Sequence, residues 1–226
     1  MIRFYFHHTP NPMKVALFLE EAGLPYEVVP VDTFKGQQHE SAYRAINPNG
    51  KTPAIEDDGV RVFDSNAILL YLGDKIQRFV GTPKDRGELL SWLMFVATGL
   101  GPYSGQAVHF QRMAPEQIPY AIKRYRFEAK RHYAVLDEHL ANRPFMVGDD
   151  YSIVDMAAWG WIDRYVPVLG EGELAPFAHL HRWYQGVNAR PAVERARNIG
   201  QNLTFKADFD DETKRHFFRH IYEEVN

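Results

Sequence analysis

The sequence contains no cysteine in its 226 residues. This absence excludes disulfides within the chain, thiolate metal sites and a protein thiol nucleophile. Any thiol chemistry must therefore use the sulfur of a ligand. The ten histidines do not replace cysteine as metal ligands, because none has ligand spacing with a third partner. We predict no metal site.

Long hydrophobic runs and a strong charge of one sign are also absent. No apolar run approaches the roughly 18 residues that a membrane span needs, and no charged-then-apolar leader precedes the first strand. We therefore expect a cytoplasmic protein that does not enter a membrane. The net charge of −3 and the lack of a long basic cluster argue against nucleic-acid binding. The hydrophobic content of 45% is enough for a core in one large or two small domains.

The first thirty residues have the pattern of a βαβ unit. The β-forming segment Ile2–Phe6 predicts a strand, and the apolar run from Lys14 to Ala22 predicts a helix. Asn11 is the expected N-cap of that helix, and Gly23 is its expected end. A second strand is expected over Tyr26–Val31. Two strands joined by a helix should be parallel.

The segment that follows contains a turn, a hairpin and the start of a helix. Residues 53–63 predict two strands joined by an Asp-Asp-Gly turn, and 65–77 predict a helix across the sheet. The Thr52-Pro53 bond opens the first of these strands and is compatible with either a cis or a trans isomer. Ser65 is the expected N-cap, whose free N–H groups can hold a carboxylate, and Asp64 can hold an ammonium group. These residues fit the α-amino acid end of a ligand, or they form a plain helix cap.

After a Pro-containing charged linker at 81–86, the pattern is helical. The helix 86–97 should kink or break at a glycine-rich stretch. Residues 119–140 should form a long amphipathic helix with Tyr120 and Phe127 facing inward. A capping box at 152–155 should begin a nearly all-apolar, central helix. Shorter helices are expected over 176–187 and 191–200.

The chain thus divides into an α/β domain at residues 1–80, an all-helical domain at 87–200 and a C-terminal extension at 201–226. The extension carries a stripe of Phe217, Phe218, Ile221 and Tyr222, which predicts a short helix docked on the body. The alternative is a swapped or disordered tail.

The order of proline turn, hairpin, Asp-Ser pair, amphipathic helix and capping box resembles the glutathione S-transferase superfamily. Four segments are similar to the bacterial Nu class and to relatives of a yeast nitrogen regulator: Thr9–Val15, Lys35–Gln38, and residues 101–106 and 118–125. The resemblance implies a thioredoxin-like βαβ-ββα domain joined to an all-α domain. It also implies a cis proline, glutathione as co-substrate and a homodimer.

The resemblance assigns roles to particular residues. Thr9 and Asn11 contact the glutathione sulfur and are the catalytic candidates, since Tyr5 lies too deep in its strand. Tyr103, Phe110 and Met113 either wall a second subsite or pack in the core. An arginine from the partner subunit, Arg124 or else Arg131, reaches the ligand. The implied glutathione-binding set is Gln38, Lys51, Thr52, Pro53, Asp64, Ser65 and Arg124.

This resemblance implies an enzyme that reduces a small-molecule disulfide with glutathione, with weak conjugating or peroxidase activity. Conjugation of glutathione to an electrophile is one alternative. A non-catalytic glutathione-binding regulatory module and a structural subunit of an assembly are the others. One departure is Thr52, because Val or Ile is usual before the proline.

Overall fold

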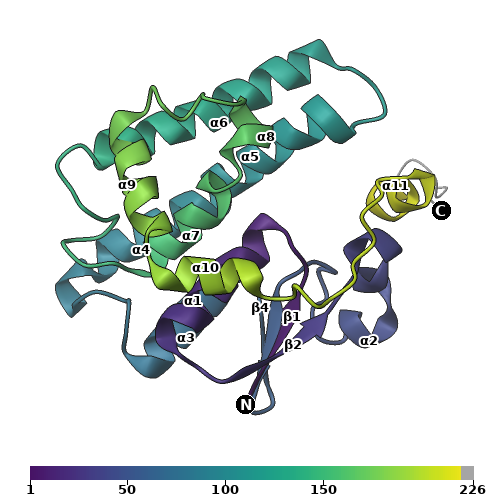
Figure 1. Ribbon diagram of the computed structural model, residues 1–226, viewed down its shortest axis with the longest axis horizontal. Coiled ribbons are helices and arrows are strands. Elements are labelled where there is room, and N and C mark those ends of the chain that lie inside the picture. The colour runs from purple at the N-terminus through teal and green to yellow at the C-terminus, as the bar shows by residue number, and fades with distance from the viewer. Residues whose placement is uncertain (220–226) are drawn as a thin grey trace.

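The structure is a computed structural model and describes residues 1–219. Its N-terminal part is built on a four-stranded sheet, β1 (Ile2–Phe6), β2 (Tyr26–Pro30), β3 (Ala54–Asp57) and β4 (Val60–Phe63), in the order β2-β1-β3-β4. β1 and β2 are parallel, as predicted, and the other pairs are antiparallel. The expected glutathione S-transferase fold, with a thioredoxin-like mixed sheet, is confirmed (Figure 1).

Helices cover this sheet unequally. α1 (Pro10–Ala22) and α3 (Ser65–Ile76) share the main core with the alternate β1 residues Phe4 and Phe6. On the other face, Tyr5 packs in a small cluster with Tyr43 of the four-residue α2 (Ser41–Arg44). The 3-10 turns η1 (Thr33–Lys35) and η2 (Gln37–His39) precede α2. The carboxyl end of β1 continues through the buried His7 to the start of α1.

The helical part begins with one long, uninterrupted helical rod. It consists of α4 (Arg86–Phe95), the π turn η4 (Val96–Leu100), α5 (Gly101–Val108) and a second π turn, η5 (His109–Met113). Of the predicted kink or break, the break is absent, because Pro102 lies in the first turn of α5 and the chain stays helical throughout. The irregularity is the π turn η4, which interrupts the α-helical hydrogen bonding at the glycines. The remaining helices are α6 (Pro119–His139), α7 (Ile153–Ile162), α8 (Tyr165–Leu169), α9 (Ala178–Asn188) and α10 (Pro191–Asn198).

α7 is the central helix of this part, as predicted. Ser152 and Asp155 form the expected capping box, and every residue of α7 except Trp161 is buried. α7 and α10 both pack against α1, so the two parts of the chain share one core (Figure 1).

The prediction for the inward face of α6 is wrong at two positions. Tyr120 and Phe127 are 75% and 65% exposed. They are seven residues apart and so share one face, whereas the buried face carries Ala129 and Tyr133. The aromatic residues of α6 are therefore divided between core and surface.

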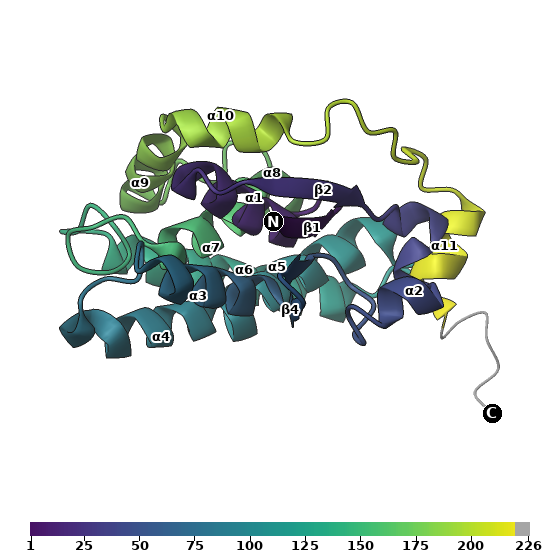
Figure 2. The same cartoon turned by 90° about the horizontal axis from the view of Figure 1, so that it is seen from below.

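The C-terminal extension returns to the sheet. After α10 the chain crosses to α11 (Asp211–Phe217), which lies beside α2 (Figure 2). The predicted short helix is thus present, while Ile221 and Tyr222 lie outside the described residues. Among residues 1–219, no helix is long and apolar enough to cross a membrane.

Candidate functional site

The site begins at the start of α1. Thr9, rather than Asn11, is the N-cap, so the predicted cap is wrong by two residues. The reason is that Pro10 occupies the first helical position, where a missing N–H costs nothing. The Thr9 side chain makes no capping hydrogen bond, which leaves its hydroxyl available to a ligand above the positive end of α1.

Asn11 is held by the helical domain. Its Oδ1 accepts a hydrogen bond from Trp161 Nε1 at 3.0 Å. This bond fixes the side-chain amide so that its N–H₂ group is the free, donating end. Trp161 is a positioning residue that the sequence did not reveal, because the contact joins residues 150 positions apart.

The turn before Pro53 is the second component. The Thr52-Pro53 peptide bond is cis, as the resemblance implies. The hydroxyl of Tyr43 and the amide of Asn47 both donate to the Lys51 carbonyl oxygen, at 2.7 and 2.6 Å. These bonds fix the backbone of the turn on which Lys51 and Thr52 lie.

Thr9, Gln38, Lys51 and Thr52 converge on one cavity of about 280 Å³, which we call the Gln38 cavity. Gln38 is buried, and within the described residues its Oε1 has no hydrogen-bond partner. Its amide nitrogen lies 3.2 Å from His39 Nε2. This wall therefore carries one buried acceptor that is open to a hydrogen-bond donor in the cavity.

A second cavity of about 390 Å³, the Asp64 cavity, adjoins the first because Lys51 lines both. Asn11, Lys51, Asp64 and Ser65 line it from the N-terminal domain. The helical rod supplies the opposite wall, with Val96, Ala97, Gly101, Pro102, Gly105 and Gln106. The Asp64 cavity is therefore polar on the side of the N-terminal domain, and its opposite wall is mostly small or apolar apart from Gln106.

The prediction that Ser65 caps α3 is wrong. Asp64 is the N-cap, with φ of 69°, and its carboxylate accepts hydrogen bonds from the N–H groups of Asn66 and Ala67. These two N–H groups are thus already occupied and cannot hold a ligand carboxylate. A left-handed backbone favours Asp or Asn among non-glycine residues, which explains why the cap falls at this position.

A buried lysine also lines the Asp64 cavity at this point. Lys14 of α1 is only 1% exposed, and its Nζ lies 3.3 Å from Ser65 Oγ and 3.4 Å from Asn66 Oδ1. Burial lowers the pKa of the Lys14 ammonium group from 10.5 to about 7, and the Asp64 carboxylate opposes this effect. Its alkyl chain crosses Gly160 of α7, where a Cβ atom would lie 2.5 Å from Lys14 Cγ. Sequence reasoning missed Lys14, although a lone lysine inside the apolar run Met13–Leu19 was a usable signal.

Other predicted site residues lie outside the two cavities. Arg124 and Arg131 are exposed on α6. Tyr103 and Phe110 pack against Tyr125 of α6, with ring centroids 6.4 and 5.2 Å apart. Met113 ends the second π turn. The second subsite at these residues stays a prediction.

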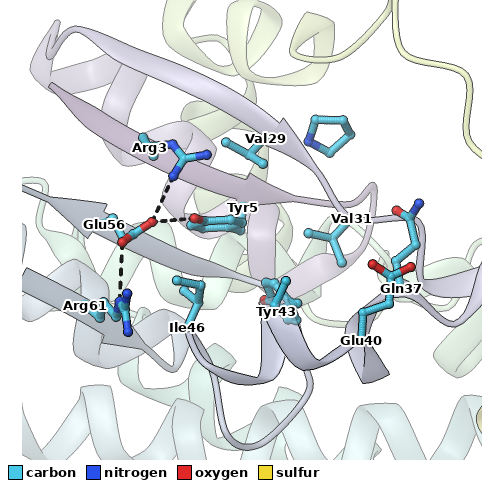
Figure 3. A pocket seen from close by; sticks show the side chains of 12 residues that line it. Arg3, Tyr5, Val29, Val31, Gln37, Glu40, Tyr43, Ile46, Glu56 and Arg61 are labelled. Atoms are coloured by element: carbon cyan, nitrogen blue, oxygen red, sulfur yellow. Dashed lines mark hydrogen bonds and ion pairs between the residues drawn. The ribbon is translucent and has the colours of Figure 1, made fainter. Parts of the chain in front are cut away.

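A further cavity, of about 480 Å³, lies on the α2 side of the sheet (Figure 3). Its polar groups satisfy one another, since Tyr5, Arg3 and Arg61 all bond to the Glu56 carboxylate. Burial, with the Glu56 bond, raises the pKa of Tyr5 to about 12. The Tyr5 hydroxyl therefore stays protonated and is engaged by Glu56 on the α2 side of the sheet. The described residues contain no group of three or more His, Asp or Glu side chains that could hold a metal ion.

Comparison with known proteins identifies the family. Residues 2–74 match the glutathione S-transferase N-terminal domain, and residues 106–191 match the glutathione S-transferase C-terminal domain. The chain therefore belongs to the glutathione S-transferase family, and the resemblance found in the sequence is confirmed.

Relatives of known structure or name place the chain within this family. It is 42% identical over 204 residues to the Escherichia coli disulfide-bond oxidoreductase YfcG, covering 87% of this chain and 94% of that protein. A Pseudomonas putida glutathione transferase, with one glutathione disulfide bound per subunit, superposes with a TM-score of 0.82 at 33% identity, covering 88% and 91% of the two chains. A Burkholderia graminis glutathione transferase, with two glutathione molecules per subunit, gives 0.81 at 33%, covering 87% of each.

Proposed function

We propose that this protein is a glutathione-dependent disulfide-bond reductase. The observation that carries the proposal is the convergence of Thr9, Asn11, Thr52 and Asp64 on two adjoining cavities at the start of α1, in a chain without cysteine. The similarity to a disulfide-bond oxidoreductase over most of both chains supports the reaction class.

The charges of the site suggest one direction for bound glutathione. Its γ-glutamyl ammonium group pairs with the Asp64 carboxylate, and its γ-glutamyl carboxylate faces Lys14 and Ser65. The backbone of Thr52 pairs with the cysteinyl residue. The sulfur then lies near Thr9 and Asn11, and the glycyl end extends into the Gln38 cavity.

The chemistry uses the sulfur that the ligand brings. A free thiol has a pKa of about 8.5, and a helix N-terminus lowers it. The Thr9 hydroxyl and the Asn11 amide donate hydrogen bonds to the thiolate without becoming bases. The thiolate attacks one sulfur of the substrate disulfide, forming a mixed disulfide and releasing the other sulfur as a thiolate. A second glutathione then attacks the mixed disulfide, which yields glutathione disulfide and the second thiol.

The active unit we propose is a homodimer in which Arg124 of each subunit reaches the partner's site. Val60 and Phe63 of β4 and Leu90 and Met94 of α4 are exposed apolar side chains, and such residues support a subunit interface. The arginine would neutralise carboxylates of a second glutathione or of the disulfide dimer. Lys35 and Lys51 can contribute to the same zone.

The test compares two reactions of one preparation. We expect reduction of 2-hydroxyethyl disulfide by glutathione to be far faster than conjugation to chlorodinitrobenzene. The opposite ratio would make the protein a conjugating transferase. Glutathione binding with neither reaction would favour a non-catalytic regulatory module.

A further inference from the structure

The C-terminal extension is attached beside the Gln38 cavity of its own chain. We call residues 205–218 the strap. The Phe205 ring lies 4.6 Å from the His7 ring, and the Lys206 N–H donates to the buried Asp32 carboxylate at 2.8 Å. The rings of Phe209 and Phe217 both contact Phe34 of η1, at 5.9 and 5.6 Å. Aromatic contacts and a charge-assisted hydrogen bond therefore hold the strap on the N-terminal domain.

The strap also reaches the helical domain. Phe218 is 4% exposed, and its ring lies 5.3 Å from that of His109 in η5. The two residues before it, His216 and Phe217, are thereby held between contacts to both domains. Figure 2 shows α11 beside α2, at one end of the molecule.

His216 and Phe217 line the Gln38 cavity together with Thr9, Gln38 and Lys51. They form its wall and leave about 280 Å³ open. His216 fits there because its neighbour is Gly36, where a Cβ atom would lie 2.5 Å from the imidazole Nδ1. The His216 carbonyl oxygen lies 3.1 Å from His39 Nε2, so the backbone is also tied to the cavity wall.

We propose that the strap closes the glycyl end of the glutathione site, with His216 and Phe217 as specificity-determining residues for the free glycyl carboxylate. This inference rests on the proposed function, which directs the glycyl end into the Gln38 cavity. A ring N–H of His216 donates to the carboxylate, and the Phe217 ring shields that bond from water. A glutathione whose glycyl carboxylate is esterified loses the charge that the wall recognises.

The experiment is titration calorimetry of the full-length protein with glutathione and with its glycyl ethyl ester. We expect the ester to bind roughly tenfold more weakly than glutathione, the loss of a hydrogen bond to a charged group. His216→Leu should remove most of this discrimination by weakening glutathione and leaving the ester unchanged, and His216→Gln, which keeps an N–H donor, should restore part of it. Phe217→Ala should weaken glutathione severalfold. Arg215→Gln, at an exposed α11 residue outside the cavity lining, is the matched control.

The outcomes separate the two proposals. The full-length protein could bind glutathione while His216→Leu and Arg215→Gln show the same ratio of affinities for glutathione and its ester. The inference about the strap would then be wrong, and the proposed function would stand. Tighter glutathione binding in His216→Leu or Phe217→Ala would also contradict it, because the strap would then obstruct the site. If the full-length protein binds neither ligand, the proposed function itself fails.

Discussion

At the scale of single residues, the site combines two hydrogen-bond donors, a hydroxyl without a capping bond and an amide whose orientation is fixed. The Thr9 hydroxyl makes no capping bond, whereas the Asn11 amide is oriented by Trp161. The orientation matters because an amide can present either its oxygen or its nitrogen to the cavity. With Oδ1 occupied by the indole N–H, the nitrogen is the end that faces an anion.

Asn11→Ala tests this arrangement. We expect disulfide reduction to fall at least about tenfold, since a hydrogen bond to a charged group is worth about 1.5–3 kcal/mol. Steady-state assays with 2-hydroxyethyl disulfide measure the rate, and thermal melting checks that the fold is intact. Trp161→Phe should give a smaller loss, because it removes only the group that orients Asn11. An unchanged rate in Asn11→Ala would remove this residue from the mechanism.

Lys14 gives a pH dependence of stability. Its folded pKa of about 7 is below its ordinary value of 10.5, so between these values the unfolded chain holds a proton that the folded chain has lost. The free energy of unfolding therefore gains up to about 1.4 kcal/mol per pH unit from this residue as the pH rises through that window.

Urea unfolding at pH 7, 8 and 9 measures this effect. Lys14→Met should be relatively more stable near pH 7, and its advantage over the unmodified protein should shrink as the pH rises. Lys123→Met, at an exposed position on α6, should follow the unmodified protein. If the free energy of unfolding of Lys14→Met and of the unmodified protein changed with pH in parallel, the pKa of Lys14 would not be lowered by folding.

At the scale of elements, the sequence predicted the order of helices and strands well and the N-terminal ends of the helices less well. The βαβ unit, the hairpin and the capping box of α7 follow from local signals: strand-forming runs, turn residues and the Ser152–Asp155 spacing. Both wrong caps arose where two residues close together in the sequence can cap. Thr9 rather than Asn11 is the N-cap of α1 because Pro10 occupies the first helical position. Asp64 rather than Ser65 is the N-cap of α3 because the backbone there has a positive φ.

The parts that the sequence did not predict depend on contacts between distant elements. Trp161 meets Asn11, Lys14 crosses Gly160, and Phe217 meets Phe34. Each contact joins side chains from segments that pack only in the finished fold. A single sequence contains no local pattern for such pairs.

The cap of α3 lets the two roles of Asp64 be separated. Asp64→Asn keeps a side chain that caps well and tolerates positive φ, so stability should change little while glutathione binding weakens, because the ammonium group loses its counter-charge. Asp64→Ala should weaken binding similarly and also lose about 0.5–2 kcal/mol of stability. Calorimetric titration and urea unfolding of the two variants make the comparison. Equal affinity of Asp64→Asn and the unmodified protein would exclude Asp64 from ligand binding.

At the scale of the whole molecule, the described chain brings Thr9, Asn11, Gln38, Thr52 and Asp64 together on two adjoining cavities but leaves the arginine outside them. Arg124 is exposed on α6 and lines neither cavity of its own chain. The proposed dimer accounts for this, because a two-fold axis brings the same surface of each subunit to the other. The exposed apolar residues of β4 and α4 supply the surface that such an axis would bury.

Mixed dimers test whether Arg124 acts across the interface. Asn11→Ala and Arg124→Ala subunits are each expected to form dimers with little activity. Subunit exchange between them should restore roughly a quarter of the unmodified activity, since about half the dimers are mixed and one of their two sites then has both residues intact. Light scattering establishes the dimer and the exchange. If Arg124 serves its own subunit, each site in a mixed dimer lacks one of the two residues and no activity returns.

The same exchange with Arg131→Ala identifies which arginine reaches the partner's site. Only the variant that lacks this arginine should have low activity alone and recover activity after exchange with Asn11→Ala.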